Sequence, residues 1–289
     1  MKLIKRIKRV AEEFLGLEHW PRDPSVTSAS FEEQIYEALI RPGDYCYDVG
    51  ANVGDVSLFL ARLAGPSGKV IAFEPVLAIY ETLRVAVERD SHLKAPIVTH
   101  PYGLAESEKQ ADINVPKGLF GMGSMAPREN WSRVQETHQI DSYDCRFIPL
   151  DSLIAQKKQV LPDFIKIDVE GAELYVLRGA TKLLKRYRPL MLIEVFSPWE
   201  RAFGYGPWEV FTFLMGYGYE FLFACPEGLV AYTPSQASPF PSQYIRGYNV
   251  VAFNANRHRD RVSSLYPLLI GAGTRILAMP PPPCPNSLA

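Results

Sequence analysis

The sequence predicts an α/β protein with a doubly wound, mostly parallel sheet of seven strands. Short apolar segments rich in Val, Ile, Phe and Tyr alternate along the chain with longer amphipathic segments. This alternation is typical of β-α-β units. Most of the apolar segments are continuous, as expected for parallel strands that are covered by helices on both faces. Right-handed crossovers between such strands give a Rossmann-like, doubly wound sheet.

The expected elements follow from these patterns and from the Gly and Pro residues between them. Strands are expected over residues 45–49, 69–75, 96–104, 163–169, 189–195, 219–224 and 248–254. Helices are expected over residues 31–40, 55–65, 76–90, 170–187 and 208–218. Residues 106–147 are polar and contain several glycines, so they are expected to form hairpins and loops.

Three regions are expected along the chain. Residues 1–30 form a basic N-terminal helix and linker, residues 31–256 form the α/β domain, and the Pro-rich residues 257–289 form a poorly ordered tail. The first ten residues, MKLIKRIKRV, contain five basic and no acidic residues and lack the apolar core of a signal peptide. The helix over residues 1–18 either packs on its own domain or rests on an anionic membrane surface.

Composition excludes several classes of protein. A formal net charge of −1 gives no support for binding to nucleic acid. The four cysteines lie far apart, which fits neither a zinc site nor a disulfide framework and is ordinary in a reducing cytoplasm. No apolar stretch approaches the ~20 residues that span a bilayer. A cytoplasmic location, with peripheral membrane contact through residues 1–18 as an addition, is therefore expected.

The first expected strand ends in the glycine-rich turn DVGANVG, residues 48–54. Gly50 and Gly54 allow a ligand to approach the backbone closely. The turn lacks the G-x-G-x-x-G spacing of a dinucleotide site and carries Asp48, which would repel a phosphate by roughly 3–4 kcal/mol at an effective dielectric near 20. The same charge favours a cation. S-adenosylmethionine, with an ammonium, a sulfonium and no phosphate, is therefore the expected cofactor, although Asp48 could instead cap the following helix.

Acidic residues also end other expected strands. Glu74, at the end of KVIAFE, can accept the two ribose hydroxyls of an adenosine group, or it is an ordinary solvated acid in a turn. Asp168 ends the strand DFIKIDV, Glu170 follows it, and Glu194 ends PLMLIE. Carboxylates at neighbouring strand ends could accept a proton from a substrate hydroxyl. Asp168 and Glu194 could alternatively hold a divalent metal ion.

Together these segments resemble the FkbM family of S-adenosylmethionine-dependent methyltransferases. The resemblance rests on RPGDYCYDVGANVGDVSLFLARLAG, KVIAFEP and FIKIDVEGAELYVLRGA followed by RPLMLIEV, and it extends over residues 41–219. It implies a seven-stranded class I methyltransferase fold. It also implies roles for single residues: the methionine end of the cofactor beside Asp48, Gly50, Asn52 and Gly54, the ribose on Glu74, and the reaction centre beside Asp168, Glu170 and Gly171. Gly103 and Tyr102 are candidates for the adenine pocket.

The resemblance further implies O-methylation of a hydroxyl on a sugar, a glycolipid or a natural product. The acceptor would be a small molecule or a glycan. Asp168 is the first candidate for the general base, acting directly or through a metal, and His100 and His138 are alternatives. Two other functions remain open: a nicotinamide-dependent reductase on a related fold, and a non-catalytic protein that binds the cofactor. The sequence does not predict an oligomeric state.

Overall fold

The structure is a computed structural model that describes residues 28–90, 95–118, 121, 123–126, 138–156, 160–225, 228–240 and 247–270. The basic N-terminal segment, with its predicted membrane contact through residues 1–18, lies outside the described residues. In the part of the chain that is described, no helix has the length and apolar character needed to cross a bilayer.

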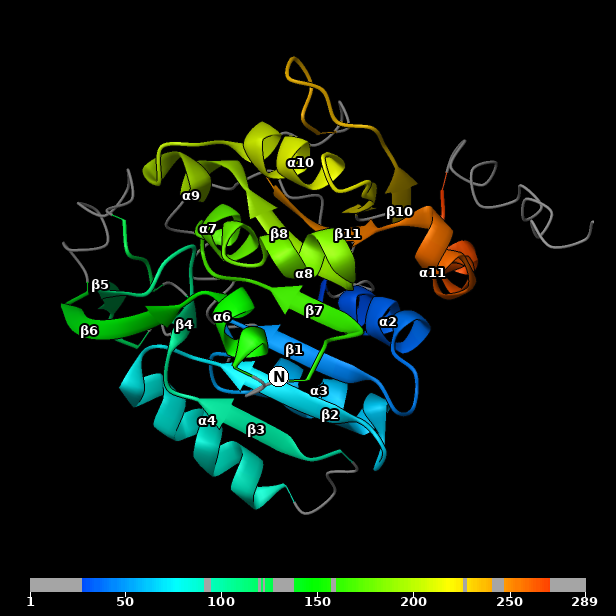
Figure 1. Cartoon of the computed structure of the whole chain (residues 1–289). Coiled ribbons are helices and arrows are strands. Elements are labelled where there is room, and N and C mark those ends of the chain that lie inside the picture. Colours follow the sequence, from blue (N-terminus) through cyan, green and yellow to red (C-terminus); the bar gives the residue numbers. More distant parts are fainter. Residues whose placement is uncertain are drawn as a thin grey trace, which may run out of the picture.

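A twisted main sheet forms the centre of the protein (Figure 1). Its strand order is β10-β9-β11-β8-β7-β1-β2-β3. The bounds are β1 Tyr45–Val49, β2 Lys69–Phe73, β3 Ile97–His100, β7 Phe164–Ile167, β8 Leu190–Phe196, β9 Glu220–Cys225, β10 Gly228–Ala231 and β11 Gly247–Phe253. β3, β2, β1, β7 and β8 pair in parallel, whereas β11 is antiparallel to both β8 and β9. The predicted doubly wound, mostly parallel sheet is therefore confirmed.

The sheet has one strand more than the seven that were predicted. The addition is β10, which pairs antiparallel with β9 at the edge of the sheet. β10 is four residues long, with the sequence GLVA. A segment this short and isolated shows no periodicity, so only its pairing with β9 identifies it as a strand.

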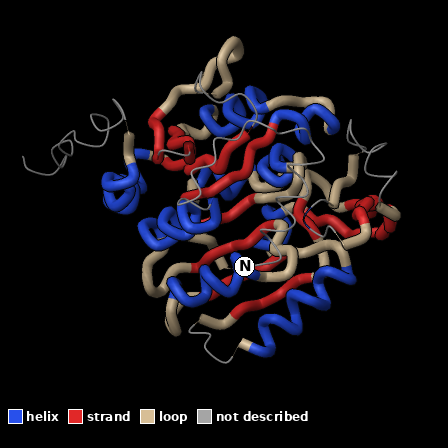
Figure 2. Tube along the Cα trace, turned by 180° about the vertical axis from the view of Figure 1, so that it is seen from behind, coloured by secondary structure: helices blue, strands red, loops and turns tan. Residues whose placement is uncertain are grey.

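Helices cover both faces of the main sheet (Figure 2). The bounds are α2 Ser28–Leu39, α3 Asp55–Ala64, α4 Leu77–Arg89, α6 Leu150–Ala155, α7 Glu173–Arg178, α8 Thr181–Arg186, α9 Ser197–Ala202, α10 Pro207–Met215, α11 Ala255–Val262 and the 3-10 helix η2 Ser263–Leu268. Residues of α2, α3, α11 and η2 share one apolar cluster with the sheet. Residues of α6, α7, α8 and α10 share the other.

Alternate residues of each strand serve these two clusters. In β1, Cys46 belongs to the α2 side and Tyr47 to the α7 side, and both side chains have zero exposed surface. In β8, Leu192 and Ile193 divide in the same way. Because both faces are covered, both sets of side chains are apolar, which explains the continuous apolar runs in the sequence.

A second, three-stranded sheet has the order β4-β6-β5. Its strands are β4 Gly103–Leu104, β5 Lys109–Pro116 and β6 Ile140–Ile148, and β5 and β6 form an antiparallel pair. The predicted hairpin in residues 106–147 is thus confirmed. The predicted third strand over residues 96–104 is divided, because β3 joins the main sheet and β4 joins the second one. The second sheet begins directly after β3 and so lies beside the carboxyl end of the main sheet (Figure 1).

The single helix predicted over residues 170–187 is wrong, because the structure has two short helices, α7 and α8, separated at Gly179 and Ala180. A Cβ atom on Gly179 would lie 2.1 Å from the carbonyl oxygen of Ala105. The chain that leads out of β4 therefore passes directly over the break. This tertiary contact explains why Gly179 is required, and no local helical pattern could indicate it.

The prediction of a poorly ordered tail from residue 257 is wrong for residues 257–268. Residue 257 lies inside α11, and η2 follows α11 on the α2 face of the sheet. Val262 and Leu265 have no exposed surface. Arg261 donates two hydrogen bonds to Asp44, at 2.5 and 2.7 Å. Residues 271–289, which include the proline run, lie outside the described residues.

Replacing Arg261 with Met should destabilise the domain by about 3 kcal/mol, because the Asp44 carboxylate, 6% exposed, would lose its charged partner inside the protein. Urea unfolding followed by circular dichroism measures this loss. Arg257 of the same helix is exposed, so Arg257→Met is the matched control, with a change below about 0.5 kcal/mol. Equal effects of the two substitutions would show that α11 is not anchored by the Arg261–Asp44 pair.

Candidate active site

The site lies where the order of the strands reverses, between β1 and β7. From β1 the chain moves outward through β2 and β3, and it then returns to β7 on the other side of β1. Ligands of doubly wound sheets bind outside the carboxyl ends of the strands at this point. The turn after β1 is fixed there by its backbone: Gly50 and Ala51 donate to the Phe73 carbonyl, both at 3.0 Å.

The glycine turn has the backbone conformation that its sequence requires. Gly50, Asn52 and Gly54 have φ angles of 85°, 50° and 97°. A Cβ atom on Gly50 would lie 1.9 Å from the carbonyl oxygen of Asp168. The turn after β1 therefore touches the chain after β7, and this contact brings the predicted cofactor turn to the predicted reaction centre. Gly54 is the N-cap residue of α3.

Gly50→Ala should destabilise the protein by about 3–5 kcal/mol, because it combines an unfavourable φ with a backbone clash. Gly204 provides a matched control: its φ is 80°, but a Cβ atom added there would have no other atom within 4 Å. Gly204→Ala should therefore cost only about 1 kcal/mol. Chemical denaturation of both variants tests the comparison, and equal costs would mean that the contact between Gly50 and Asp168 does not constrain the turn.

The Asp48 side chain is buried under the glycine turn and is not exposed at the ligand-facing side of the turn. Its side chain is 2% exposed, and its Oδ2 accepts a hydrogen bond of 2.5 Å from the Ser57 hydroxyl in α3. Burial raises the pKa of Asp48 to about 6, against the opposing effects of Ser57 and Lys166. The expectation that its carboxylate faces the ligand directly has to be corrected, because the bond to Ser57 turns the side chain toward α3. Its carboxylate still lies close enough to Lys166 and Asp168 for their charges to affect its pKa.

Glu74 follows β2 and lies next to the turn. Its Oε2 accepts from the Asn52 amide at 3.0 Å and its Oε1 from the Val76 amide at 2.9 Å. It is 6% exposed, so it is not an ordinary solvated acid. Burial raises the pKa of Glu74 to about 7, and the two backbone donors oppose this shift. Each carboxylate oxygen has a second lone pair, which leaves acceptor capacity for a ligand hydroxyl.

Gly103 begins β4 and lies close to Pro75, the residue after Glu74. A Cβ atom there would lie 2.6 Å from the ring of Phe147 and 3.4 Å from Pro75. Packing against Phe147 is thus one reason for a glycine at this position. The neighbouring Tyr102 stacks on His100, with ring centroids 5.0 Å apart. His100 also stacks on Phe73 at 5.4 Å, and burial lowers its pKa, so this ring is part of an aromatic stack.

Asp168, Glu170 and Glu194 converge at the ends of β7 and β8. Each contributes a carboxylate oxygen, and these oxygens all lie within 4.8 Å of one another. Glu170 reaches the group because its φ is 59°, which makes a left-handed turn ahead of α7. The three residues predicted for the reaction centre are therefore brought together. We refer to them below as the carboxylate cluster.

Glu194 is the member of the carboxylate cluster whose pKa is shifted most clearly. Burial raises the pKa of Glu194 well above its usual range, and Asp168 raises it further, both by its charge and as a hydrogen-bond partner. Glu194 therefore holds a proton more firmly than an exposed glutamate does. The Asp168 side chain, 35% exposed, is open to a substrate.

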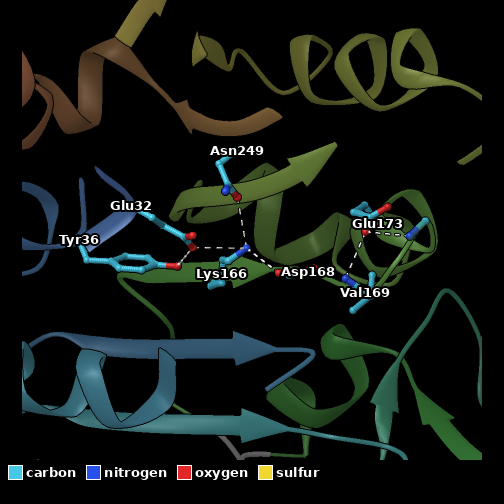
Figure 3. A network of polar contacts seen from close by, with 8 residues as sticks. Glu32, Tyr36, Lys166, Asp168, Val169, Glu173 and Asn249 are labelled. Carbon is cyan, nitrogen blue, oxygen red and sulfur yellow. Dashed lines mark hydrogen bonds and ion pairs between the residues drawn. The ribbon is translucent and has the colours of Figure 1, made fainter. Parts of the chain in front are cut away.

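A lysine from inside the sheet completes the cluster. Lys166 of β7 is 2% exposed, and its Nζ donates to Asp168 Oδ2 at 3.2 Å and to Asn249 Oδ1 at 3.4 Å (Figure 3). Glu32 of α2 lies 3.9 Å from the same Nζ. Burial alone would lower the pKa of Lys166, but Asp168, Glu32 and Glu194 outweigh it and raise the pKa above its usual value.

Two further acids are buried behind the cluster. Glu173 opens α7, and its Oε1 accepts from the amides of Val169 and Gly171, both at 3.2 Å (Figure 3). This is the structural role expected of an acid in a first helical turn. Glu200 of α9 has no exposed surface, and neither of its carboxyl oxygens has a hydrogen-bond partner among the described residues. Burial, Glu173 and Glu209 raise the pKa of Glu200 to about 9, so it is protonated at neutral pH.

Sequence reasoning missed Lys166, Glu32, Asn249 and Glu200. Lys166 carried a usable signal, because it stands inside the apolar strand FIKI, where a charged residue needs a buried partner. Asn249 in β11 offered a weaker signal of the same kind. Glu32 and Glu200 lie in helices, where an acid is ordinary, and only the packing of those helices reveals their surroundings.

Comparison with known proteins agrees with this geometry. The methyltransferase FkbM domain matches residues 48–221, which is more than half of the chain. The chain belongs to the FkbM methyltransferase family. The match begins at Asp48 and includes the glycine turn, Glu74 and the whole carboxylate cluster. Glu32 and Asn249 lie outside it.

Several curated proteins are similar in sequence to this chain. A hexuronic acid methyltransferase, AglP, of Haloferax volcanii is 27% identical over 172 residues, covering 57% of this chain and 63% of AglP. The 31-O-demethyl-FK506 methyltransferase FkbM of Streptomyces tacrolimicus is 29% identical over 163 residues, covering 48% of this chain and 60% of that protein. Methyltransferase sdnD of Sordaria araneosa is 27% identical over 190 residues, covering 58% of this chain and 73% of sdnD. The chain thus matches less than two thirds of the length of AglP and FkbM.

Among solved structures, a methyltransferase FkbM from Methylobacillus flagellatus is similar to this chain. The sequence identity is 17% and the TM-score is 0.44, with 76% of this chain and 50% of that chain covered.

Proposed function

We propose that this FkbM family protein transfers a methyl group from S-adenosylmethionine to a hydroxyl oxygen of a sugar, a glycolipid or a natural product. The observation that carries the proposal is the contact between two parts of the site. The glycine turn of β1 touches the backbone of Asp168, and the carboxylate cluster lies at the ends of the adjacent strands β7 and β8. A cofactor on the turn would therefore lie beside a candidate base.

The residues around the turn fit this cofactor. Gly50 and Gly54 hold the turn in left-handed backbone conformations that favour glycine, and Glu74 keeps acceptor capacity for ribose hydroxyls. The methionine end would lie along residues 50–54, and the adenine near Tyr102 and Gly103. The buried acids Asp48 and Glu74 add negative potential, which disfavours the pyrophosphate of a dinucleotide.

The carboxylate cluster fits the proton transfer that the reaction needs. When bound, S-adenosylmethionine supplies a methyl group activated by the positive sulfonium. Asp168 would accept the proton of the acceptor hydroxyl and so leave the oxygen able to accept the methyl group. Burial and Asp168 raise the pKa of Glu194, and Lys166 compensates the charge on Asp168. A positioned base of this kind contributes about 10²–10⁴-fold, and alignment of the two substrates contributes the rest.

The named relatives support the class of acceptor. AglP is a methyltransferase for hexuronic acid, and FkbM acts on 31-O-demethyl-FK506. A sugar and a natural product are therefore both represented among proteins similar to this chain. We propose a small-molecule or glycan acceptor and a cytoplasmic location, with residues 1–18 as a peripheral contact to membranes.

Mass spectrometry of metabolites and glycans tests the proposal. Extracts of cells that lack the protein are incubated with the purified full chain and S-adenosylmethionine carrying a CD₃ group. Transfer gives product ions heavier by one CD₃ group in place of a hydrogen. The Asp168→Asn variant is the matched negative control. Labelled products would also exclude a purely cofactor-binding role, whereas an absence of label in glycan, lipid and small-molecule fractions would contradict the proposed function.

A further inference from the structure

Lys166 brings a fixed positive charge into the carboxylate cluster. Its ammonium group has three N–H donors and is surrounded by three oxygen atoms, from Asp168 at 3.2 Å, Asn249 at 3.4 Å and Glu32 at 3.9 Å (Figure 3). The side chain is 2% exposed, so water does not screen this charge effectively. The ammonium is therefore held at one place beside Asp168.

Two of its partners come from outside residues 48–221, the part that matches the family. Glu32 belongs to α2, and its Oε1 accepts a hydrogen bond of 2.5 Å from the Tyr36 hydroxyl one helical turn later. Asn249 belongs to β11 and stands directly opposite Glu194 in the antiparallel pairing of β11 and β8. Helix α2 and strand β11 thus support the lysine from two sides.

The ammonium and a divalent metal ion would compete for the same cluster. Asp168, Glu170 and Glu194 offer the oxygen ligands that Mg²⁺ or Mn²⁺ prefers. However, Asp168 Oδ2 is already paired with Lys166, and a second cation bound there would face a charge only a few ångströms away. At such distances the repulsion inside a protein is large compared with the screened interaction in water.

We infer that Lys166 is a positioning residue of the reaction centre, held by Glu32 and Asn249, and that its ammonium takes the place of a divalent metal ion beside Asp168. The role of Lys166 in the reaction rests on the proposed methyl transfer, whereas the binding of a metal ion can be measured without it. It changes one sequence-based expectation, because the cluster then works as an ammonium-supported base and not as a metal site.

Titration of the full chain with Mn²⁺ tests the inference directly. The metal is followed by electron paramagnetic resonance, which detects free Mn²⁺, after removal of metals with EDTA. The wild type should show no saturable site tighter than about 1 mM. Lys166→Met, which removes the charge but keeps an apolar stem, should bind Mn²⁺ at least about tenfold more tightly. Adding Glu194→Gln to that variant should abolish the gain.

Two further variants and one binding measurement show whether Lys166 positions Asp168 or only stabilises the fold. Lys166→Arg keeps the charge and should behave like the wild type toward Mn²⁺. Lys166→Met should also slow methyl transfer, because Asp168 loses its charged partner, and Lys166→Arg should keep part of this activity. Glu37→Gln, at an exposed position of α2, should change nothing. Binding of S-adenosylhomocysteine is measured in the wild type and in each variant. If the proposed function is wrong, the wild type will not bind S-adenosylhomocysteine, and this result is independent of the Mn²⁺ titration.

Saturable Mn²⁺ binding by the wild type that disappears in Glu194→Gln would overturn the inference. A folded Lys166→Met variant with no gain in Mn²⁺ affinity would overturn it as well. If Lys166→Met does not fold, the wild-type titration still decides, because it asks whether a metal binds beside the lysine.

Discussion

Asp168→Asn should slow methyl transfer by about 10²–10⁴-fold and leave the affinity for S-adenosylhomocysteine within about twofold of the wild type. Asparagine keeps the shape of aspartate but cannot accept the proton of an acceptor hydroxyl. The predicted cofactor contacts come from residues 50–54 and Glu74, whose backbone and side-chain bonds do not involve the Asp168 carboxylate.

Single-turnover assays with labelled S-adenosylmethionine and the acceptor found by mass spectrometry measure the first effect, and calorimetry measures the second. Lys166 loses a charged partner in this variant, so thermal unfolding has to be recorded alongside. Asp163→Asn provides a control near the opposite end of β7, since Asp163 accepts from the Tyr45 amide and lies away from the cluster. If Asp168→Asn kept full turnover, Asp168 could not be the base.

Glu200 should make the stability of the protein fall as the pH rises. The pKa of its carboxyl is about 9 in the folded state and near the ordinary value of 4.5 in the unfolded state. Between these values the folded state binds more protons than the unfolded state. The stabilisation by protonated Glu200 is therefore complete below about pH 4.5 and is lost as the pH rises through 9.

Glu200→Gln removes this dependence, because glutamine stays neutral. We compare the free energy of unfolding of Glu200→Gln with that of the wild type. The variant's value minus the wild-type value should rise by up to about 5 kcal/mol between pH 4.5 and pH 8. A shallower slope of the same sign should remain, since burial also raises the pKa values of Glu74 and Glu173 to about 7.

Urea unfolding at a series of pH values measures the two slopes. Glu220→Gln, at an exposed position of β9, should keep the wild-type slope. Parallel curves for the wild type and Glu200→Gln would show that Glu200 is ionised, or bonded to a group that the present geometry does not provide.

The sequence predicted the fold well wherever structure is set by local pattern. The parallel strands were recognisable because both faces of each strand are buried, as Cys46 and Tyr47 illustrate. The turn at Gly50 was recognisable because few residues other than glycine adopt its backbone conformation. The features that were missed depend on contacts between distant parts of the chain. The contact of Gly179 with Ala105 at the break between α7 and α8 is one example, and the anchoring of α11 through Arg261 to Asp44 is another.

The same distinction applies to the site. Asp168 and Glu194 were found because they lie near the carboxyl ends of neighbouring strands, and parallel strands bring these ends to one edge. The orientation of Asp48 was not predictable, since it depends on the position of Ser57 in the following helix. Glu32 could not be found at all, because its role comes only from the packing of α2 over β7.

The central claim is that the glycine turn and Glu74 bind S-adenosylmethionine and not a dinucleotide. Isothermal titration of the full chain with S-adenosylhomocysteine and, separately, with NADH tests it most directly. The account predicts saturable one-to-one binding of S-adenosylhomocysteine, weakened at least about tenfold by Glu74→Ala, and no binding of NADH. Binding of NADH, or an affinity for S-adenosylhomocysteine that Glu74→Ala leaves unchanged, would contradict the account.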